Sequence, residues 1–109
     1  VVEAPAAPEI YRSVEQMPEA GYSIPEFILK NLRYPDAARE NGIEGRVAVE
    51  FVVNEDGSIS NVRVAKKLGA GCDEEAVRVV NSFPKWKPGK QNGHPVKVYY
   101  TQVITFRLE

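Results

Sequence analysis

The chain has 109 residues, of which 43% are hydrophobic and 27% charged, so it is long enough for one small globular domain and too short for two. Its formal net charge of −1 argues against a general nucleic-acid-binding protein, which needs a clearly basic surface. Between Lys85 and Arg107, however, there are five basic residues and no acidic one. We interpret this stretch as a solvated face that would also suit an acidic partner.

The beginning of the chain predicts a linker followed by a lead-in segment. Residues 1–9 are rich in Pro and Ala, as is typical of an extended spacer. Residues 10–22 contain breakers at Pro18 and Gly21, and we expect one short strand around Ile10–Val14. The chain starts at Val1 without a methionine, so we expect a fragment, with any targeting or membrane segment upstream.

Two helices are predicted next. Ser23-Ile24-Pro25-Glu26 is a helix-start signature, and apolar residues follow at helical spacing up to Leu32. This helix should stop before Tyr34, because the residue ahead of a proline is disfavoured in the α region. Pro35 then opens a short helix, Asp36 to Asn41, which Gly42 ends.

A β-hairpin follows. Arg46 to Val53 alternates apolar residues onto one face and stays partly apolar on the other. The turn Asn54–Gly57 ends in the Asp-Gly signal, and Ser58 to Lys66 is the return strand. Its apolar residues fall out of phase, which predicts a bulge near Ser60–Asn61.

The last third predicts a helix, an irregular connection and a long strand. The helix runs from Cys72 to Phe83, with Cys72 as a small hydrophobe on its apolar stripe. Prolines and glycines then break the chain around Trp86, which we expect to be a buried plug of the core. Val96 to Leu108 is a half-buried strand with Tyr99 on its polar face.

Strand direction predicts the sheet. An all-antiparallel sheet requires the first hairpin strand in the middle, giving a three-stranded antiparallel sheet in the order second–first–last. The expected fold class is therefore α+β, with helices packed on one face and a long C-terminal edge strand. Most of that edge would be unpaired, which makes it either an aggregation risk or a docking site.

The inventory of reactive side chains argues against an enzyme. His94 is the only histidine and Cys72 the only cysteine, so neither a nucleophile–base pair nor a metal site has the residues it needs. The glycines do not follow phosphate-loop spacing. We therefore expect no catalytic residues, no metal and no cofactor.

Several motifs together resemble one family. They are Tyr34-Pro35 with Ala37-Ala38, Glu44-Gly45 before a strand, Asp56-Gly57 at the turn, and Trp86-Lys87-Pro88-Gly89. In this combination, residues 32–108 resemble the C-terminal domain of TonB energy transducers, so residues 23–109 would be that domain. Residues 14–21 also resemble the lead-in of one branch of the family, but that branch usually has a Pro-Gly-Gly run near here and this chain has Ala20-Gly21-Tyr22.

The resemblance implies a location and partners. The domain would lie in the periplasm of a Gram-negative bacterium, anchored to the inner membrane by one upstream transmembrane helix. Inner-membrane proton-driven motor proteins would act through the missing N-terminal region. The partners would be outer-membrane transporters for siderophores or other nutrients, whose TonB box adds as a strand beside the last strand.

The resemblance also implies partner-binding residues at two places. One is the Tyr-Pro region, Arg33, Tyr34 and Pro35, whose local role is to terminate the first helix. The other is the strand edge, comprising Val98, Tyr99, Tyr100, Thr101, Gln102, Val103 and Ile104. For Tyr99, partner contact and simple β-propensity remain equal alternatives.

Two other functions fit the same pattern. Similar domains occur fused to membrane metallopeptidase sensors, and the segment upstream of Val1 would separate that architecture from a transducer. Alternatively, the long edge strand pairs with itself and gives a homodimer.

Overall fold

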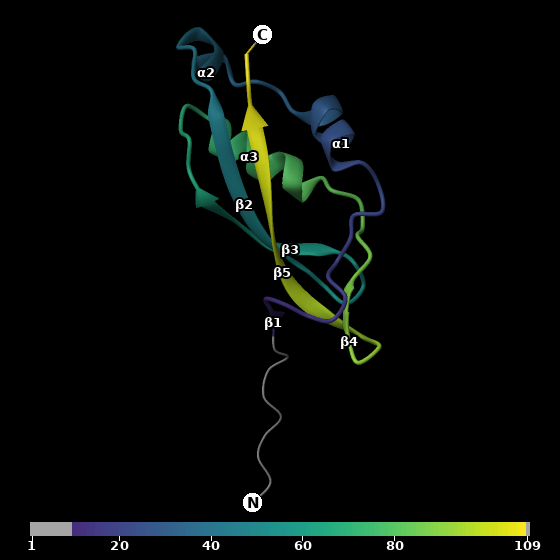
Figure 1. Cartoon of the computed structure of the whole chain (residues 1–109). Coiled ribbons are helices and arrows are strands. Elements are labelled where there is room, and N and C mark those ends of the chain that lie inside the picture. The colour runs from purple at the N-terminus through teal and green to yellow at the C-terminus, as the bar shows by residue number, and fades with distance from the viewer. Residues whose placement is uncertain (1–9, 109) are drawn as a thin grey trace, which may run out of the picture.

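The computed structural model describes residues 10–108; the expected linker, residues 1–9, lies outside them. Five strands and three helices form two layers (Figure 1). In chain order they are β1 (Ile10–Tyr11), α1 (Ile24–Asn31), α2 (Asp36–Glu40), β2 (Gly45–Val53), β3 (Ile59–Lys66), α3 (Cys72–Asn81), β4 (Gly89–Gln91) and β5 (His94–Phe106). No helix in the described part is long and apolar enough to cross a membrane.

The sheet confirms the predicted α+β class and strand order. Its path is β1-β5-β2-β3, so the first hairpin strand, β2, lies between β3 and β5 and is antiparallel to both. Two short strands, β1 and β4, add to the expected three, and both pair with β5. The sheet is therefore mixed, because β1 runs parallel to β5.

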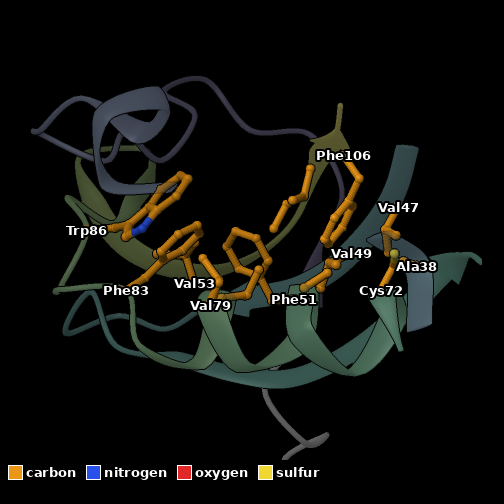
Figure 2. Packing of buried hydrophobic residues seen from close by; sticks show 13 residues of the cluster. Ala38, Val47, Val49, Phe51, Val53, Cys72, Val79, Phe83, Trp86 and Phe106 are labelled. Atoms are coloured by element: carbon orange, nitrogen blue, oxygen red, sulfur yellow. The ribbon is translucent and has the colours of Figure 1, made fainter. Parts of the chain in front are cut away.

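β2 is the central strand, and its residues from Val49 to Val53 are shielded from water on both faces. Val47, Val49, Phe51 and Val53 are fully buried on one face, and Val52 is 1% exposed on the other. The inner face packs against α3, whose buried residues include Cys72 and Val79 (Figure 2). Cys72 is thus a core residue, as predicted. Burying a side chain of this size stabilises the fold by about 1.5–3 kcal/mol.

Aromatic rings fill one end of this core. Phe51 contacts Phe83, Trp86 and Tyr100, with ring centroids 6.0, 5.4 and 5.7 Å away. Trp86 is only 5% exposed, which confirms its predicted role as a core plug (Figure 2). Edge-to-face rings of this kind contribute about 0.5–1.5 kcal/mol per pair beyond their buried area.

The hairpin and its bulge follow the sequence closely. The register between β2 and β3 shifts between Glu50↔Arg63 and Val52↔Ser60, so β3 holds one extra residue there. Asn61 takes a φ of 51°, in the left-handed region that asparagine tolerates. The predicted bulge near Ser60–Asn61 is confirmed.

β5 begins and ends two residues earlier than the predicted Val96–Leu108. The connection before it is also more regular than expected, since β4 and β5 form a tight hairpin at Asn92-Gly93. Both turn residues have positive φ, 52° and 77°, as a type I′ turn requires. Asn-Gly is the strongest short hairpin signal, so this dipeptide is the feature of the sequence that could have predicted the turn.

The start of β5 extends past the end of β2, whose ladder stops at Val53↔Val98. β4 covers this overhang at residues 94–96, and β1 covers it at Ile10↔Lys97 and Tyr11↔Val98. The expectation of an open edge is therefore wrong at Val98, because Val98 is already paired with Tyr11 of β1. The lead-in strand exists but is shorter than the predicted Ile10–Val14.

Gly57 yields the first prediction. It has φ +87°, and a Cβ added to it would lie 2.0 Å from the Trp86 carbonyl oxygen, a backbone atom that cannot move freely. We expect Gly57→Ala to lower the free energy of unfolding by about 3 kcal/mol or more. Gly42→Ala is the matched control, since Gly42 has φ +63° and open space around it, and should cost about 1–2 kcal/mol. Urea unfolding measures both, and equal losses would contradict the close approach.

Candidate strand-docking groove

One side of β5 is unpaired over most of its length. From Val98 to Phe106 its inner side pairs with β2, while on the outer side pairing in the described residues ends at Val98. We call residues Tyr99–Phe106, on that outer side, the free edge. Alternate residues of a strand direct both N–H and C=O sideways, so the free edge offers a row of hydrogen-bonding groups to an added strand.

A groove of about 380 Å³ runs along this edge, and we call it the docking groove. Its other wall is α1, which lies beside β5 on the side away from β2 (Figure 1). It is lined by Ile24, Pro25, Ile28, Leu29, Leu32, Tyr34, Gln102, Val103, Thr105 and Arg107. Apolar side chains therefore border the unpaired backbone.

Exposed apolar side chains concentrate at the same place. Of the three large hydrophobic residues exposed in the described part, Leu29 (82%) and Val103 (46%) both line the docking groove. Met17, the third, lies outside it. Apolar surface that a domain leaves in water beside unpaired strand backbone is typical of a peptide-binding site.

α1 begins as the sequence predicts. The Ser23 side chain accepts a hydrogen bond from the Glu26 backbone N–H at 3.3 Å, and Pro25 stands in the first turn, where it removes no needed bond. The Phe27 ring packs against Phe83 at 5.3 Å and ties the helix to the core. No residue of α1 is buried, so the helix covers the core with one side and exposes the other.

The far end of α1 is held by two residues of α3, which we call the Glu75–Arg78 clamp. Arg78 Nη2 donates to the Asn31 carbonyl oxygen at 2.6 Å, and the Arg33 backbone N–H donates to Glu75 Oε2, also at 2.6 Å. Arg78 and Glu75 pair with each other at 2.7 Å. The clamp thus satisfies backbone groups just where α1 ends and ties that end of the helix to α3.

Tyr34 connects the clamp to the free edge. Its ring meets Phe106 edge-on at 5.6 Å, and its hydroxyl donates to the Ile43 carbonyl oxygen. The backbone is extended from Leu32, where ψ is 129°, so α1 ends at Asn31, three residues before Tyr34, as predicted.

The structure brings only part of the predicted site together. Tyr34, Gln102 and Val103 line the docking groove, while Arg33 and Pro35 line a shallower hollow beside the clamp. Thr101 is exposed on the free edge. Ile104 is fully buried and Tyr100 packs on Trp86 at 4.9 Å, so these two offer backbone groups but no free side chain.

Tyr99 has an intramolecular partner. The Arg12 guanidinium lies 4.4 Å from the centre of its ring, a cation–π contact on the face of the sheet opposite α3. This contact lies outside the docking groove, and it gives the ring a role within the domain.

Seven groove residues were not among those predicted for the site: Ile24, Pro25, Ile28, Leu29, Leu32, Thr105 and Arg107. Leu29 carries a sequence signal, since it is apolar yet falls outside the helical stripe of Ile24, Phe27, Ile28 and Leu32. A leucine placed off the buried stripe of an amphipathic helix is a candidate contact residue. Arg107 carries no such signal, because it simply continues the polar face of the last strand.

The chemistry of the groove is that of binding. Within residues 10–108, no group of three or more His, Cys, Asp or Glu side chains is arranged to hold a metal ion. The groove itself combines unpaired strand backbone, an apolar helix face and one cation, Arg107. In strand-addition sites of other proteins, groups of these kinds contact the main chain and the alternate side chains of an extended peptide.

The clamp gives a pH-dependent prediction. Hydrogen bonding from Arg78 is the main cause that lowers the pKa of the Glu75 carboxyl below its ordinary value of 4.5. A carboxyl with a lowered pKa in the folded state stabilises the fold above its unfolded value and loses that contribution as pH falls through the lowered pKa. We expect the natural chain and Glu75→Gln to differ in stability at pH 6 and to converge as the pH falls below 4.5 and through the lowered pKa. Glu74→Gln, one residue away on the exposed side, is the control, and thermal unfolding across this pH range is the measurement. A Glu75→Gln curve parallel to that of the natural chain would contradict the ion pair.

Comparisons with known proteins identify the family of the chain. Residues 30–108 match the family described as Gram-negative bacterial TonB protein C-terminal. The chain is 30% identical over 76 residues to Protein TonB of Pseudomonas aeruginosa, covering 70% of this chain and 22% of that protein. It is 50% identical over 58 residues to Protein TonB of Helicobacter pylori strain J99, covering 49% of this chain and 21% of that protein. The chain thus spans about a fifth of the length of these curated relatives.

Solved structures give the same result for the fold. An NMR solution structure of Helicobacter pylori TonB-CTD superposes with a TM-score of 0.60 at 30% identity, covering 79% of this chain and 90% of that one. A solution NMR structure of Pseudomonas aeruginosa TonB CTD gives a TM-score of 0.54 at 29% identity, covering 72% and 79%. The chain belongs to the family of Gram-negative bacterial TonB protein C-terminal domains.

Proposed function

We propose that this domain is the receptor-binding end of a TonB-type energy transducer. In this function it binds the TonB box of outer-membrane transporters by strand addition at the free edge, and it passes energy from the inner-membrane proton-motive force to nutrient uptake. The observation that carries the proposal is the coincidence of unpaired β5 backbone with the apolar docking groove. The role is mechanical and requires no catalytic group.

The geometry of the groove supports strand addition in particular. The free edge spans eight residues, Tyr99 to Phe106, or about 26 Å at ~3.3 Å per residue. An added strand would direct alternate side chains toward α1, where Ile28 and Leu29 line the groove, and the others toward solvent. Its affinity would come mainly from main-chain hydrogen bonds, which accept many sequences, while α1 would favour apolar residues at every second position.

The remaining parts of the function belong to the longer protein. In the proposal the domain lies on the periplasmic side of the inner membrane, and an upstream transmembrane helix anchors it and contacts the motor proteins. The lengths of the curated relatives leave ample room for such a region. Because β1 holds the lead-in segment on β5, a pull from the N-terminal side would reach the same strand that binds the transporter.

The first test uses a peptide carrying a transporter's TonB box and NMR spectroscopy of the labelled domain. We expect the backbone amide signals of residues 99–106 to shift, and those of the hairpin turn, Asn54–Gly57, to stay in place. Shifts elsewhere with a silent free edge would contradict docking at β5. A second copy of the chain competes for the same edge, so sedimentation across a concentration series separates self-pairing from peptide binding.

The groove side chains are tested by Leu29→Glu. Leu29 is 82% exposed, so the change should leave the free energy of unfolding within about 0.5 kcal/mol. It should weaken peptide binding roughly tenfold or more, because burying a leucine contributes about 1.5–3 kcal/mol and 1.4 kcal/mol is a factor of ten. Met17→Glu is the matched control, an exposed apolar residue outside the groove. If calorimetry gave Leu29→Glu and Met17→Glu the same affinity for the peptide, α1 would not be part of the binding site.

The backbone is tested by two neighbouring proline variants, Thr101→Pro and Gln102→Pro. Consecutive residues direct their N–H groups to opposite sides of β5, so one proline removes a bond to β2 and the other a donor of the free edge. We expect the variant that loses the free-edge donor to keep most of its thermal stability and to lose peptide binding. If the more stable variant bound the peptide like the natural chain, strand addition would be wrong.

A further inference from the structure

The face of the sheet opposite α3 is open and carries excess positive charge. By the strand register, Arg46, Lys66, Arg63 and Lys97 point to this side, and Arg12 reaches over it from the lead-in segment. The single carboxylate among them is Glu50. The open face, defined by these six residues, has a formal charge of +4 in a chain whose net charge is −1.

Only two of its cations are paired. Glu50 is 8% exposed and lies between Arg63 (2.9 Å) and Arg12 (3.3 Å), so one carboxylate holds two guanidiniums against the sheet. Arg12 also covers the Tyr99 ring. Arg46, Lys66 and Lys97 form no ion pair with any residue in the range 10–108. The positive charge is therefore left available to a partner.

The charges are spread over a surface rather than gathered at a point. Arg46 lies opposite Thr105 on β5, eight positions from Lys97, which corresponds to about 26 Å along the strand. Across the sheet they extend over three strands spaced by ~4.8 Å. A small anion would contact one or two of these groups, whereas an extended acidic surface would face them all.

The open face is continuous with the free edge. Thr101, Val103 and Thr105 lie on the free edge, and their side chains point to the same side of the sheet as the open face. A protein whose strand docks at the edge therefore places its neighbouring surface next to this face. Docking at the free edge would not bring a membrane or a free polyanion next to the open face.

We propose that the open face receives an acidic surface of the same protein that supplies the docked strand. This inference rests on the proposed function and adds a second contact to it. Attraction between extended surfaces of opposite charge speeds encounter and orients the partners, while the groove supplies the short-range contacts. The docked strand would then be the end of a longer interface.

The experiment compares two tailed peptides on three proteins. A TonB-box peptide is joined through a flexible Gly-Ser linker to six glutamates or to six glutamines, with the tail at each end in turn. The proteins are the natural chain, the open-face variant Arg46→Gln/Lys66→Gln/Lys97→Gln, and the control Lys30→Gln/Lys67→Gln/Lys85→Gln. The control removes the same charge from exposed lysines outside the open face.

At 50 mM salt we expect the glutamate tail to bind the natural chain and the control about tenfold more tightly than the glutamine tail. For the open-face variant the gain should fall below about twofold, and for all three proteins it should vanish at 1 M salt. The untailed peptide should bind all three equally.

Three outcomes would overturn the inference. If the untailed peptide binds but the glutamate tail gives no gain, or an equal gain in both variants, the open face does not receive an acidic surface and the proposed function still stands. If vesicles with 30% phosphatidylglycerol capture the natural chain but not the open-face variant, and the tail gives no gain, the face binds a membrane instead. If the untailed peptide fails to bind, the proposed function is wrong and the inference with it.

Discussion

The ladder between β2 and β5 is the constraint on which the rest of the domain depends. β2 carries much of the inner core, and in the described part of the chain it pairs with β3, its hairpin partner, on one side and with β5, the longest strand, on the other. The ladder fixes which residues of β5 face the core, so Ile104 and Phe106 are buried in the same cluster as the apolar residues of α3. It also leaves the outer side of β5 without a long neighbour. The free edge is a consequence of how the core is built.

An unpaired edge beside apolar surface normally invites aggregation, and this domain limits that risk in two ways. β1 and β4 occupy the overhang of β5 at residues 94–98, so the accessible edge is only eight residues long. α1 lies beside the rest, held by the Glu75–Arg78 clamp at one end and by Phe27 at the other. A strand that enters must therefore fit between a helix and a sheet edge, which is more selective than an open edge.

Most of the core could be predicted from local pattern, whereas the boundaries of the site could not. The alternation in Arg46–Val53, the Asp56-Gly57 turn and the phase break at Asn61 each follow from one short segment, and the structure confirms them. Strand order followed from direction alone. Whether Val98 is free depends on two segments far apart in the chain, Ile10–Tyr11 and Gly89–Gln91, which a strand pattern does not reveal. The position of α1 beside β5 likewise depends on contacts from α3 that no local signal in α1 predicts.

In the proposed complex, the free edge and the open face act over different distances. Main-chain bonds along the free edge act only at hydrogen-bond distance and accept many sequences, so they provide affinity with little discrimination. The apolar wall of α1 adds a preference for alternate apolar residues at the same short range. Unpaired charges on the open face act over about a Debye length, ~8 Å at physiological salt, before any strand has docked. In the proposed complex, charge would raise the rate of encounter, while the short edge would keep the bound state reversible.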